Sequence, residues 1–330
     1  MEKKRRRFNV LLRGFSWLLI LLVVLVHPCF GAEDPTKYPS KPITMIVPWP
    51  PGGTGDLSSR KICDLASKVL GQPILIVNKG GGAGVIGISA IAKADPDGYT
   101  IGHITHSPTV LIPHLRSVPY NTKKDFTFLM QYAEFLYTFC VLSDSPWKTF
   151  KEFIEHARKH PEKVTFGTPG PLSVCHIFME QVALAENVKL THLPTQGDAE
   201  MVTQHLGGRV DGSLGAPLVP HIPTGKVRGL AVMSERRFEV IPDAPTFSEL
   251  GYKIEYSNFS GVCAPADLDP RVLNKLSNAF KKAYEDPSFK ELLASLGMRP
   301  LYRDPESFKS MVIKDYDRLG EVIKKLNLAR

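Results

Sequence analysis

The sequence predicts an α/β protein with two lobes, each a mainly parallel β-sheet flanked by helices. Apolar, β-branched runs alternate with amphipathic helical stretches in two separate sets, before residue 106 and between residues 135 and 233. Such alternation predicts parallel strands joined by right-handed helical crossovers. A glycine-containing loop follows an early strand in each set, and the C-terminal part is predicted to be helical. Two α/β lobes predict a cleft between them.

The first set alternates three strands with two helices. Asp56 is predicted to cap the first helix, and Gly71 to end it in a left-handed conformation. Ile62, Leu65 and Val69 fall on one face of that helix. The predicted elements are a strand at 43–49, a helix from 56, a strand at 73–78, a helix at 85–94 and a strand at 99–105.

The second set begins with a strand at 135–143, and Thr149 with Glu152 then forms a capping box that starts a helix. A further helix is predicted at 174–186. The remaining strands of this set are predicted at 164–168, 188–194, 210–217 and 227–233. In the C-terminal part, Asp269-Pro270 and Asp304-Pro305 each predict a helix start with proline in the first turn.

A C-terminal tail that returns to the first lobe makes the chain cross between the lobes twice. We expect the crossings near 137–141 and 259–264. This places lobe 1 at 38–137 plus 262–330, and lobe 2 at 138–261. Cys140 and Cys263 lie on these crossing segments, so a disulfide between them is an open alternative to free, buried thiols.

Residues 1–31 have the three parts of a secretory signal peptide: a basic start, an uncharged apolar core at 15–26, and small residues before Ala32. The chain is therefore expected to be exported to the periplasm. The alternative is an uncleaved anchor, but extending the apolar segment to Phe8 would bury Arg13 in the bilayer.

The formal charge of +8 comes largely from this N-terminal segment. It holds six of the 41 basic and one of the 33 acidic residues, so the rest of the chain carries 35 and 32, a net +3. Because the rest has no basic run suited to nucleic acid, nucleic-acid binding is excluded. No C-x-x-C pair is present outside this segment, and His103 and His106 point to opposite faces of a strand, so no metal site is predicted.

Residues 82–87 read G-x-G-x-x-G, the spacing of a dinucleotide-binding loop. That fingerprint requires an acid at the end of the next strand, and His106-Ser107-Pro108 stands there instead. The glycines are therefore interpreted as permitting a tight turn and close backbone packing, and no cofactor is predicted.

Two other loops are suited to binding an anion. The segments 47–56 and 166–173 each join a strand to a helix through glycines and hydroxyl residues. Main-chain N–H groups and the positive end of the helix dipole favour an anion at such a helix start. Two loops of this kind facing each other would hold a small organic anion from both sides.

At these residues the sequence resembles the Bug-type (TctC-like) substrate-binding proteins of tripartite tricarboxylate transporters. The resemblance covers about residue 38 to the end and rests on the order of several motifs. These are YPSKPITMIVPWPPGGTGD, LGQPILIVNKGGGAGVIGISAIAKADPDGYT, KDFTFL, VTFGTPGPLS, LGGRVDG, GKVRGLAVMSERR and PDAPTFSELGY. It implies a periplasmic binding-protein (Venus-flytrap) fold that closes on a carboxylate, and it assigns the GGGAG loop to the scaffold.

The resemblance also implies a set of ligand-binding residues. The first-lobe loop contributes Pro51, Gly52, Gly53, Thr54 and Asp56, and the loop after the third strand contributes Thr105, His106 and Ser107. The second-lobe loop contributes Gly167, Thr168, Gly170 and Ser173, and Gly215 and Ala216 close that side.

The second-lobe loop departs from the family pattern. Leu172 stands where glycine is usual, and Pro169 and Pro171 each lack an N–H donor. These residues form a more apolar wall for a bulkier or aromatic acid, or the loop has changed without a change of ligand. His106 is either a carboxylate donor or a solvated strand-end residue.

The sequence thus predicts an extracytoplasmic, monomeric solute-binding protein, not an enzyme. It would capture a small organic acid and deliver it to the membrane subunits of a tripartite tricarboxylate-type transporter. The alternatives are an exported enzyme or a ligand-sensing partner of a membrane regulator on the same scaffold.

Overall fold

The computed structural model describes residues 35–234, 236–252 and 258–325, and the chain from Pro35 onward forms one compact unit. The predicted signal peptide at 1–31 lies outside the described residues. In the described part of the chain, no helix combines the length and apolarity needed to cross a membrane.

Six strands form the sheet of the first lobe, in the order β11-β4-β10-β3-β1-β2. β1 pairs in parallel with β2 and β3, which confirms the predicted strand–helix alternation. β10 and β11 run antiparallel to their neighbours, so the sheet is mixed rather than mainly parallel. The strands are β1 (Ile43–Val47), β2 (Ile74–Asn78), β3 (Thr100–Thr105), β4 (Phe126–Phe135), β10 (Phe259–Pro265) and β11 (Met298–Arg303).

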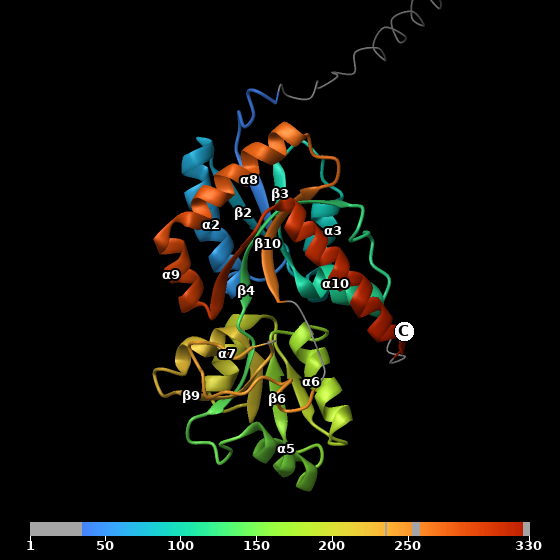
Figure 1. Ribbon diagram of the computed structural model, residues 1–330, viewed down its shortest axis with the longest axis vertical. Coiled ribbons are helices and arrows are strands. Elements are labelled where there is room, and N and C mark those ends of the chain that lie inside the picture. Colours follow the sequence, from blue (N-terminus) through green and yellow to red (C-terminus); the bar gives the residue numbers. More distant parts are fainter. Residues whose placement is uncertain (1–34, 235, 253–257, 326–330) are drawn as a thin grey trace, which may run out of the picture. The chain divides into compact units, whose positions relative to one another are not determined.

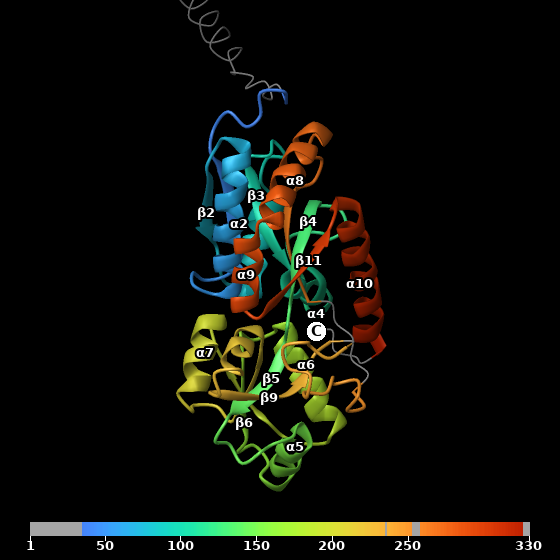
Figure 2. The same ribbon diagram turned by 60° about the vertical axis from the view of Figure 1, so that its left-hand side comes forward.

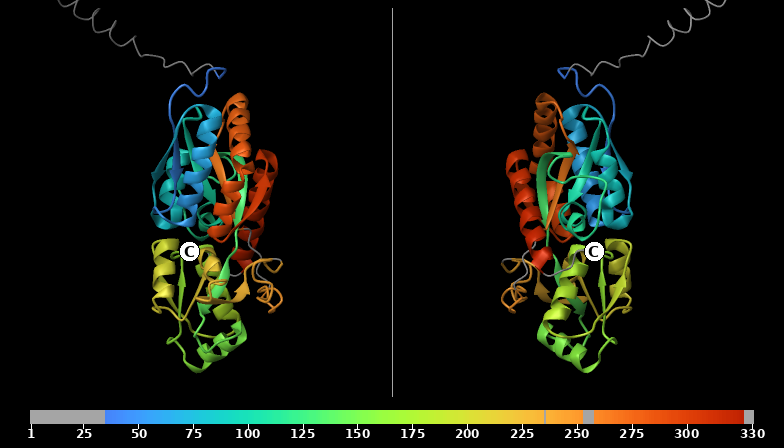
Figure 3. Two further views of the ribbon diagram at one scale, coloured as in Figure 1. Left: turned by 90° about the vertical axis from the view of Figure 1, so that its left-hand side faces the viewer. Right: turned by 90° about the vertical axis from the view of Figure 1, so that its right-hand side faces the viewer.

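Helices cover both faces of this sheet (Figure 1). One face packs against α2 (Thr54–Leu70), α8 (Pro270–Glu285) and α9 (Pro287–Ser295), with Ile62, Leu276 and Phe289 in its core. The other face packs against α3 (Val85–Ala92), α4 (Ile112–Leu115) and α10 (Pro305–Lys325), joined by the turns η1 (Gly82–Gly84) and η2 (Ser107–Leu111). Figure 3 shows the C-terminal elements, in orange and red, beside the N-terminal elements in blue.

The predicted helix ends of this lobe are largely confirmed. Gly71 ends α2 with φ of 72°, and Asp269 and Asp304 each accept a main-chain N–H at the starts of α8 and α10. Asp56 is an exception, because the N-cap of α2 is Gly53 and Asp56 lies within the first turn. These caps satisfy donors and acceptors that a helix end leaves open.

The second lobe has a five-stranded sheet in the order β7-β6-β8-β5-β9. β6 is parallel to β7 and β8, but β5 is antiparallel to β8 and β9, so this sheet is also mixed. The strands are β5 (Thr138–Leu142), β6 (Thr165–Thr168), β7 (Thr191–Pro194), β8 (Gly212–Gly215) and β9 (Val227–Val232). The helices are α5 (Phe150–Lys159), α6 (Val174–Ala185) and α7 (Asp198–Leu206), with the turn η3 (Ala216–His221).

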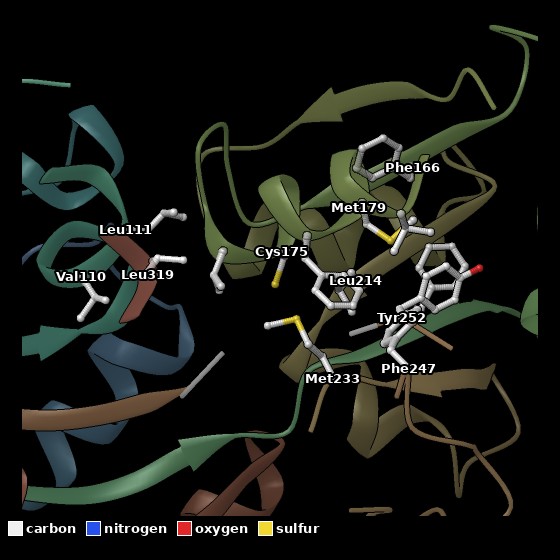
Figure 4. Packing of buried hydrophobic residues seen from close by; sticks show 14 of the residues in the cluster. Val110, Leu111, Phe166, Cys175, Met179, Leu214, Met233, Phe247, Tyr252 and Leu319 are labelled. Carbon is white, nitrogen blue, oxygen red and sulfur yellow. The ribbon is translucent and has the colours of Figure 1, made fainter. Parts of the chain in front are cut away.

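Aromatic side chains fill the core between this sheet and helices α5 and α6. Phe139 lies with its ring centroid 5.1 Å from that of Phe150 and 4.8 Å from that of Phe153. Figure 4 shows Phe247 and Tyr252 in the same core, in contact with each other and near Leu214 and Met179. α7 covers the opposite face, where Met201 packs with Cys140 and Leu218.

The chain passes from the first sheet into the second at Leu136 and Tyr137, between β4 and β5 (Figure 2). All of β10 pairs within the first sheet, so the return crossing ends before Phe259, earlier than the predicted boundary between 261 and 262. Phe135 donates its N–H to the carbonyl of Asn258, which joins the two crossings side by side.

All four cysteines of the described residues are free and buried. Cys140 lies in β5 and Cys263 in β10, which belong to different sheets, so the alternative of a disulfide between them is wrong. Burial raises the pKa of both thiols.

The glycines at 82–87 serve close packing, as interpreted from the sequence. A Cβ atom at Gly87 would lie 2.6 Å from the Cα of Pro48, so only glycine lets α3 approach the end of β1. Arg116 donates to the carbonyl of Gly82 and fixes the preceding turn.

We predict that Phe139→Ala lowers the free energy of unfolding by about 3–5 kcal/mol, because it leaves a cavity among the buried aromatic rings. Urea denaturation measures the change. Leu75→Ala is the control, since Leu75 is 53% exposed on β2 and should change stability by less than about 0.5 kcal/mol. Equal effects of the two changes would contradict this account of the core.

We also predict that protein beginning after residue 31, unfolded without reductant, titrates four thiols with a chromogenic disulfide reagent. The folded protein should react slowly, because all four are buried and their pKa values are raised. A count of two in the unfolded protein would show that a disulfide forms.

Candidate functional site

A cavity lies where the loops after β1 and β3 of the first lobe meet the loops after β6 and β7 of the second lobe. Strands β1, β3, β6 and β7 all present their C-terminal ends here, which is where open α/β sheets bind ligands. Its volume is about 70 Å³. The residues that line it are Trp49, Pro50, Pro51, Gly53, Thr54, Gly55, Thr105, Ser107, Phe135, Tyr137, Pro169, Ser173, Cys175, Gln196, Gly197, Asp198, Ala199 and Glu200.

The first-lobe loop is held in shape by the buried Asp56. Its carboxylate accepts from the N–H of Gly52 at 2.9 Å, from Nε of Arg60 at 2.9 Å and from Nδ2 of Asn78 at 2.8 Å. Burial opposes ionisation, but these donors outweigh it and hold the pKa of Asp56 below its usual value. Asp56 therefore shapes the loop and is not among the residues that line the cavity.

The start of α2 contacts a carboxylate of the second lobe. The N–H of Thr54 donates to Oδ2 of Asp198 at 3.2 Å, and the Thr54 hydroxyl donates to the same oxygen. Asp198 is the first residue of α7, and both residues line the cavity. Burial raises the pKa of Asp198, although the two donors from Thr54 act in the opposite direction.

At the start of α6, the donor belongs to the second lobe and the acceptor to the first. Ser107 of the first lobe accepts a hydrogen bond at 3.0 Å from the N–H of Val174, the first residue of α6. Both helix starts that the sequence predicted as anion sites thus have a polar partner from the opposite lobe.

Among the described residues of the cavity wall, Thr105 carries the buried side-chain polar atom that lacks a hydrogen-bond partner. The residue is 5% exposed, and within the described residues its hydroxyl has no hydrogen-bond partner. Because a buried hydroxyl without a partner is costly, a ligand acceptor is the natural complement to it.

The chain matches a known family over most of its length. Residues 58–328 match the family described as "Tripartite tricarboxylate transporter family receptor". The chain belongs to this family. It is 33% identical over 327 residues to the "UPF0065 protein in gbd 5'region" of Cupriavidus necator, a match that covers 99% of each chain.

Solved structures of this kind are similar in fold. The periplasmic binding protein BugD is 29% identical with a TM-score of 0.81, and the match covers 88% of this chain and 99% of BugD. MatC of Rhodopseudomonas palustris, with bound malate, is 26% identical with a TM-score of 0.80, and the match covers 87% of this chain and 100% of MatC. A second R. palustris protein, with adipate, is 26% identical with a TM-score of 0.78; the match covers 87% of this chain and 97% of that protein.

In this tricarboxylate-transporter receptor, the cavity brings together some of the residues that the sequence predicted. They are Pro51, Gly53, Thr54, Thr105, Ser107 and Ser173. Gly52 is next to this set, with φ of 83° in the turn that Asp56 holds.

The second-lobe loop is largely turned inward on itself. The Thr168 hydroxyl donates to the carbonyl of Gly170, and Leu172, at φ of 57°, donates its N–H to Nδ1 of His176. Ser173 caps α6 by accepting from the N–H of His176. Of the three unusual residues, Pro169 lines the cavity, whereas Leu172 packs against the core.

Several other predicted residues lie away from the cavity lining. His106 is buried, with Nε2 3.4 Å from Oδ2 of Asp315 and its ring edge-on to Phe259, so it is neither solvated nor in the cavity. Gly167 packs against Ser213, and Ala216 packs against the backbone of Gly297. Gly215 lies in β8 opposite Thr138.

Sequence reasoning missed the aromatic wall and the whole of the 196–200 segment. Trp49, Phe135 and Tyr137 line the cavity, but in the sequence they read as ordinary strand residues. Asp198 is the first residue of α7, and nothing in the sequence links it to Thr54, which is 144 positions away. Among the described residues, no group of three or more potential ligands could hold a metal ion.

We predict that stability falls as the pH drops from 7 to 5, because buried histidines are neutral in the folded protein. Burial lowers the pKa of His103 to about 3 and that of His205 to about 4. Below pH 6.5 the unfolded chain takes up protons that the folded protein does not bind, so each residue costs about 2 kcal/mol between pH 7 and pH 5.

Urea denaturation at the two pH values measures this loss. His103→Gln should reduce the difference between the two pH values by about 2 kcal/mol, whatever its effect at pH 7. The exposed His160→Gln is the control and should leave the difference unchanged. An undiminished difference in His103→Gln would contradict the assignment.

Proposed function

We propose that this protein is a periplasmic receptor that binds a small organic acid between its two lobes and delivers it to a tripartite tricarboxylate-type membrane transporter. The observation that carries the proposal is the cavity at the strand ends, with the unpartnered Thr105 hydroxyl in its wall. Membership of the receptor family supports it, as do the malate and adipate in structural relatives.

The donors for the acid are neutral. Thr105 supplies a hydroxyl, and the starts of α2 and α6 supply main-chain N–H groups at Thr54 and Val174. Oriented N–H groups at a helix start stabilise an anion without a basic side chain. The ligand carboxylate is therefore bound by several directed hydrogen bonds.

Binding requires the loops to move apart. The cavity of about 70 Å³ is smaller than the roughly 300–1,000 Å³ of typical small-molecule sites. The contacts between Thr54 and Asp198 and between Ser107 and Val174 close it. A ligand that contacts both lobes favours a closed arrangement only by the difference in its affinity for closed and open states.

An exported enzyme is the less supported alternative. Cys175 is the cysteine among the described residues that line the cavity, but burial raises the pKa of its thiol, whereas a nucleophilic cysteine needs a lowered pKa. The family itself is one of transporter receptors. Family membership also favours a role in transport over a role as a ligand-sensing partner of a membrane regulator.

The first test is calorimetric titration of the purified protein with malate and adipate, combined with mass spectrometry of small molecules released on denaturation. We expect an organic acid to bind without turnover. Thr105→Val should lower the affinity for that acid by at least about tenfold, because a hydrogen bond to a charged group contributes about 1.5–3 kcal/mol.

Thr122→Val is the matched control. Thr122 is a buried first-lobe threonine outside the cavity lining, and its hydroxyl donates to the carbonyl of Thr109. It should lower stability but leave affinity unchanged. Chemical turnover of the acid, or release of a nucleotide instead of an acid, would overturn the proposed function.

A further inference from the structure

The charges in the cavity wall are unusual for a receptor of anions. Of the described residues that line it, the charged ones are Asp198 and Glu200, and none is Lys, Arg or His. Both oxygens of Glu200 are used locally, since they accept from the N–H of Gln196 and from Nε2 of Gln204, each at 2.8 Å. Glu200 is therefore part of the first turns of α7.

Asp198 differs from Glu200, because only one of its two carboxylate oxygens accepts hydrogen bonds from the described residues. Both donors from Thr54 reach Oδ2, and among the described residues Oδ1 has no partner. This half-buried carboxylate has one oxygen that is not enclosed, and no cation is paired with it among the described residues, so a ligand cation in the cavity could pair with it.

The surroundings of Asp198 suit a cation as well. Trp49, Phe135 and Tyr137 line the same cavity, and the rings of Phe135 and Tyr137 stack with centroids 5.3 Å apart. Aromatic faces attract ammonium groups, most strongly where water is excluded. Tyr137 is close enough to Asp198 for that carboxylate to add to the rise in the tyrosine pKa, after burial and Cys175.

The same cavity offers a separate place for a carboxylate. Thr105 is on β3 of the first lobe and has the unpartnered hydroxyl described above. The N–H of Thr54, by contrast, is already bound to Asp198. A second ligand carboxylate would have to displace Asp198 from the N–H and hydroxyl of Thr54, and it would meet the charge of Asp198 without a basic residue in the described cavity lining to offset it.

We propose that Asp198 makes this receptor select organic acids that also carry a positively charged nitrogen, such as amino acids, over dicarboxylates. The inference rests on the proposed function, because it takes Thr105 to receive the carboxylate and adds a cation subsite formed by Asp198 and the aromatic wall. Asp198 is thus a specificity-determining residue of the cavity.

Matched probe pairs test this selectivity by calorimetric titration at pH 7.5. The pairs are malate and aspartate, succinate and β-alanine, and adipate and 6-aminohexanoate. In each pair an ammonium group replaces a hydroxyl or a carboxylate on a chain of similar length. We expect at least one amino acid to bind more than tenfold tighter than its partner.

Asp198→Asn removes the charge but retains an amide oxygen that can accept from Thr54. This variant should lower the affinity for the amino acid at least tenfold and raise the affinity for the dicarboxylates. Asp144→Asn is the matched control, because Asp144 is an exposed second-lobe aspartate outside the cavity lining, and it should leave both affinities unchanged. Thermal denaturation of each variant establishes that it folds.

The outcomes separate the two proposals. If dicarboxylates bind tighter in both the parent and Asp198→Asn, the cation subsite is wrong and the receptor function stands. If Asp198→Asn tightens dicarboxylates without weakening amino acids, Asp198 only competes with the ligand for Thr54 and the inference is overturned. If no probe binds either protein and no acid is released from it, the receptor function fails, and the inference fails with it.

Discussion

The insertion of β10 between β3 and β4 is the constraint on which the rest of the structure depends. β10 carries the chain back from the second lobe and pairs on both sides, with Val262 opposite His103 on β3 and Met130 on β4. Through it, strands from both ends of the sequence share one sheet. The insertion buries β3 in the sheet interior, which sets Thr105 at a fixed strand end facing the second lobe.

The loops around the cavity are held in shape by hydrogen bonds that do not involve a ligand. Asp56 uses its carboxylate to hold the first-lobe loop, so this acid stabilises the turn instead of repelling an anion. Ser173 caps α6, and His176 completes the turn before it. With the loops held internally, the groups left for a ligand are few and directed, as preorganised sites require.

Contacts between the lobes use the same groups that would hold a ligand. Thr54 donates to Asp198, and Val174 donates to Ser107, so contact between the loops already satisfies part of each helix start. A ligand must then replace these bonds with better ones, and the difference sets its apparent affinity. Acids of similar size can therefore bind with different affinities, because the charge of Asp198 changes the free energy of the bonds that each acid forms in place of those between the loops.

Much of the fold could be predicted from local pattern. The β-branched runs located most of the strands, and Gly71, Asp269 and Asp304 located helix ends, because strand periodicity and capping depend on residues close in sequence. β4 and β11 were not predicted as strands, since the C-terminal part was predicted to be helical, and the directions of β5 and β10 could not be predicted, because pairing between distant strands leaves no pattern in the local sequence. For the site, the sequence pointed to Thr54, Thr105 and Ser107 as residues near a strand end.

What the sequence by itself determined, then, is the alternation of strands and helices and the two glycine-containing loops at helix starts. Only the tertiary structure decided which of those residues share a cavity. It turned His106 toward Asp315 and turned the Thr168 loop inward, and it brought Asp198 against Thr54. The physical reason is that side-chain environment depends on contacts between segments more than a hundred residues apart, whereas the local pattern records only neighbours along the chain.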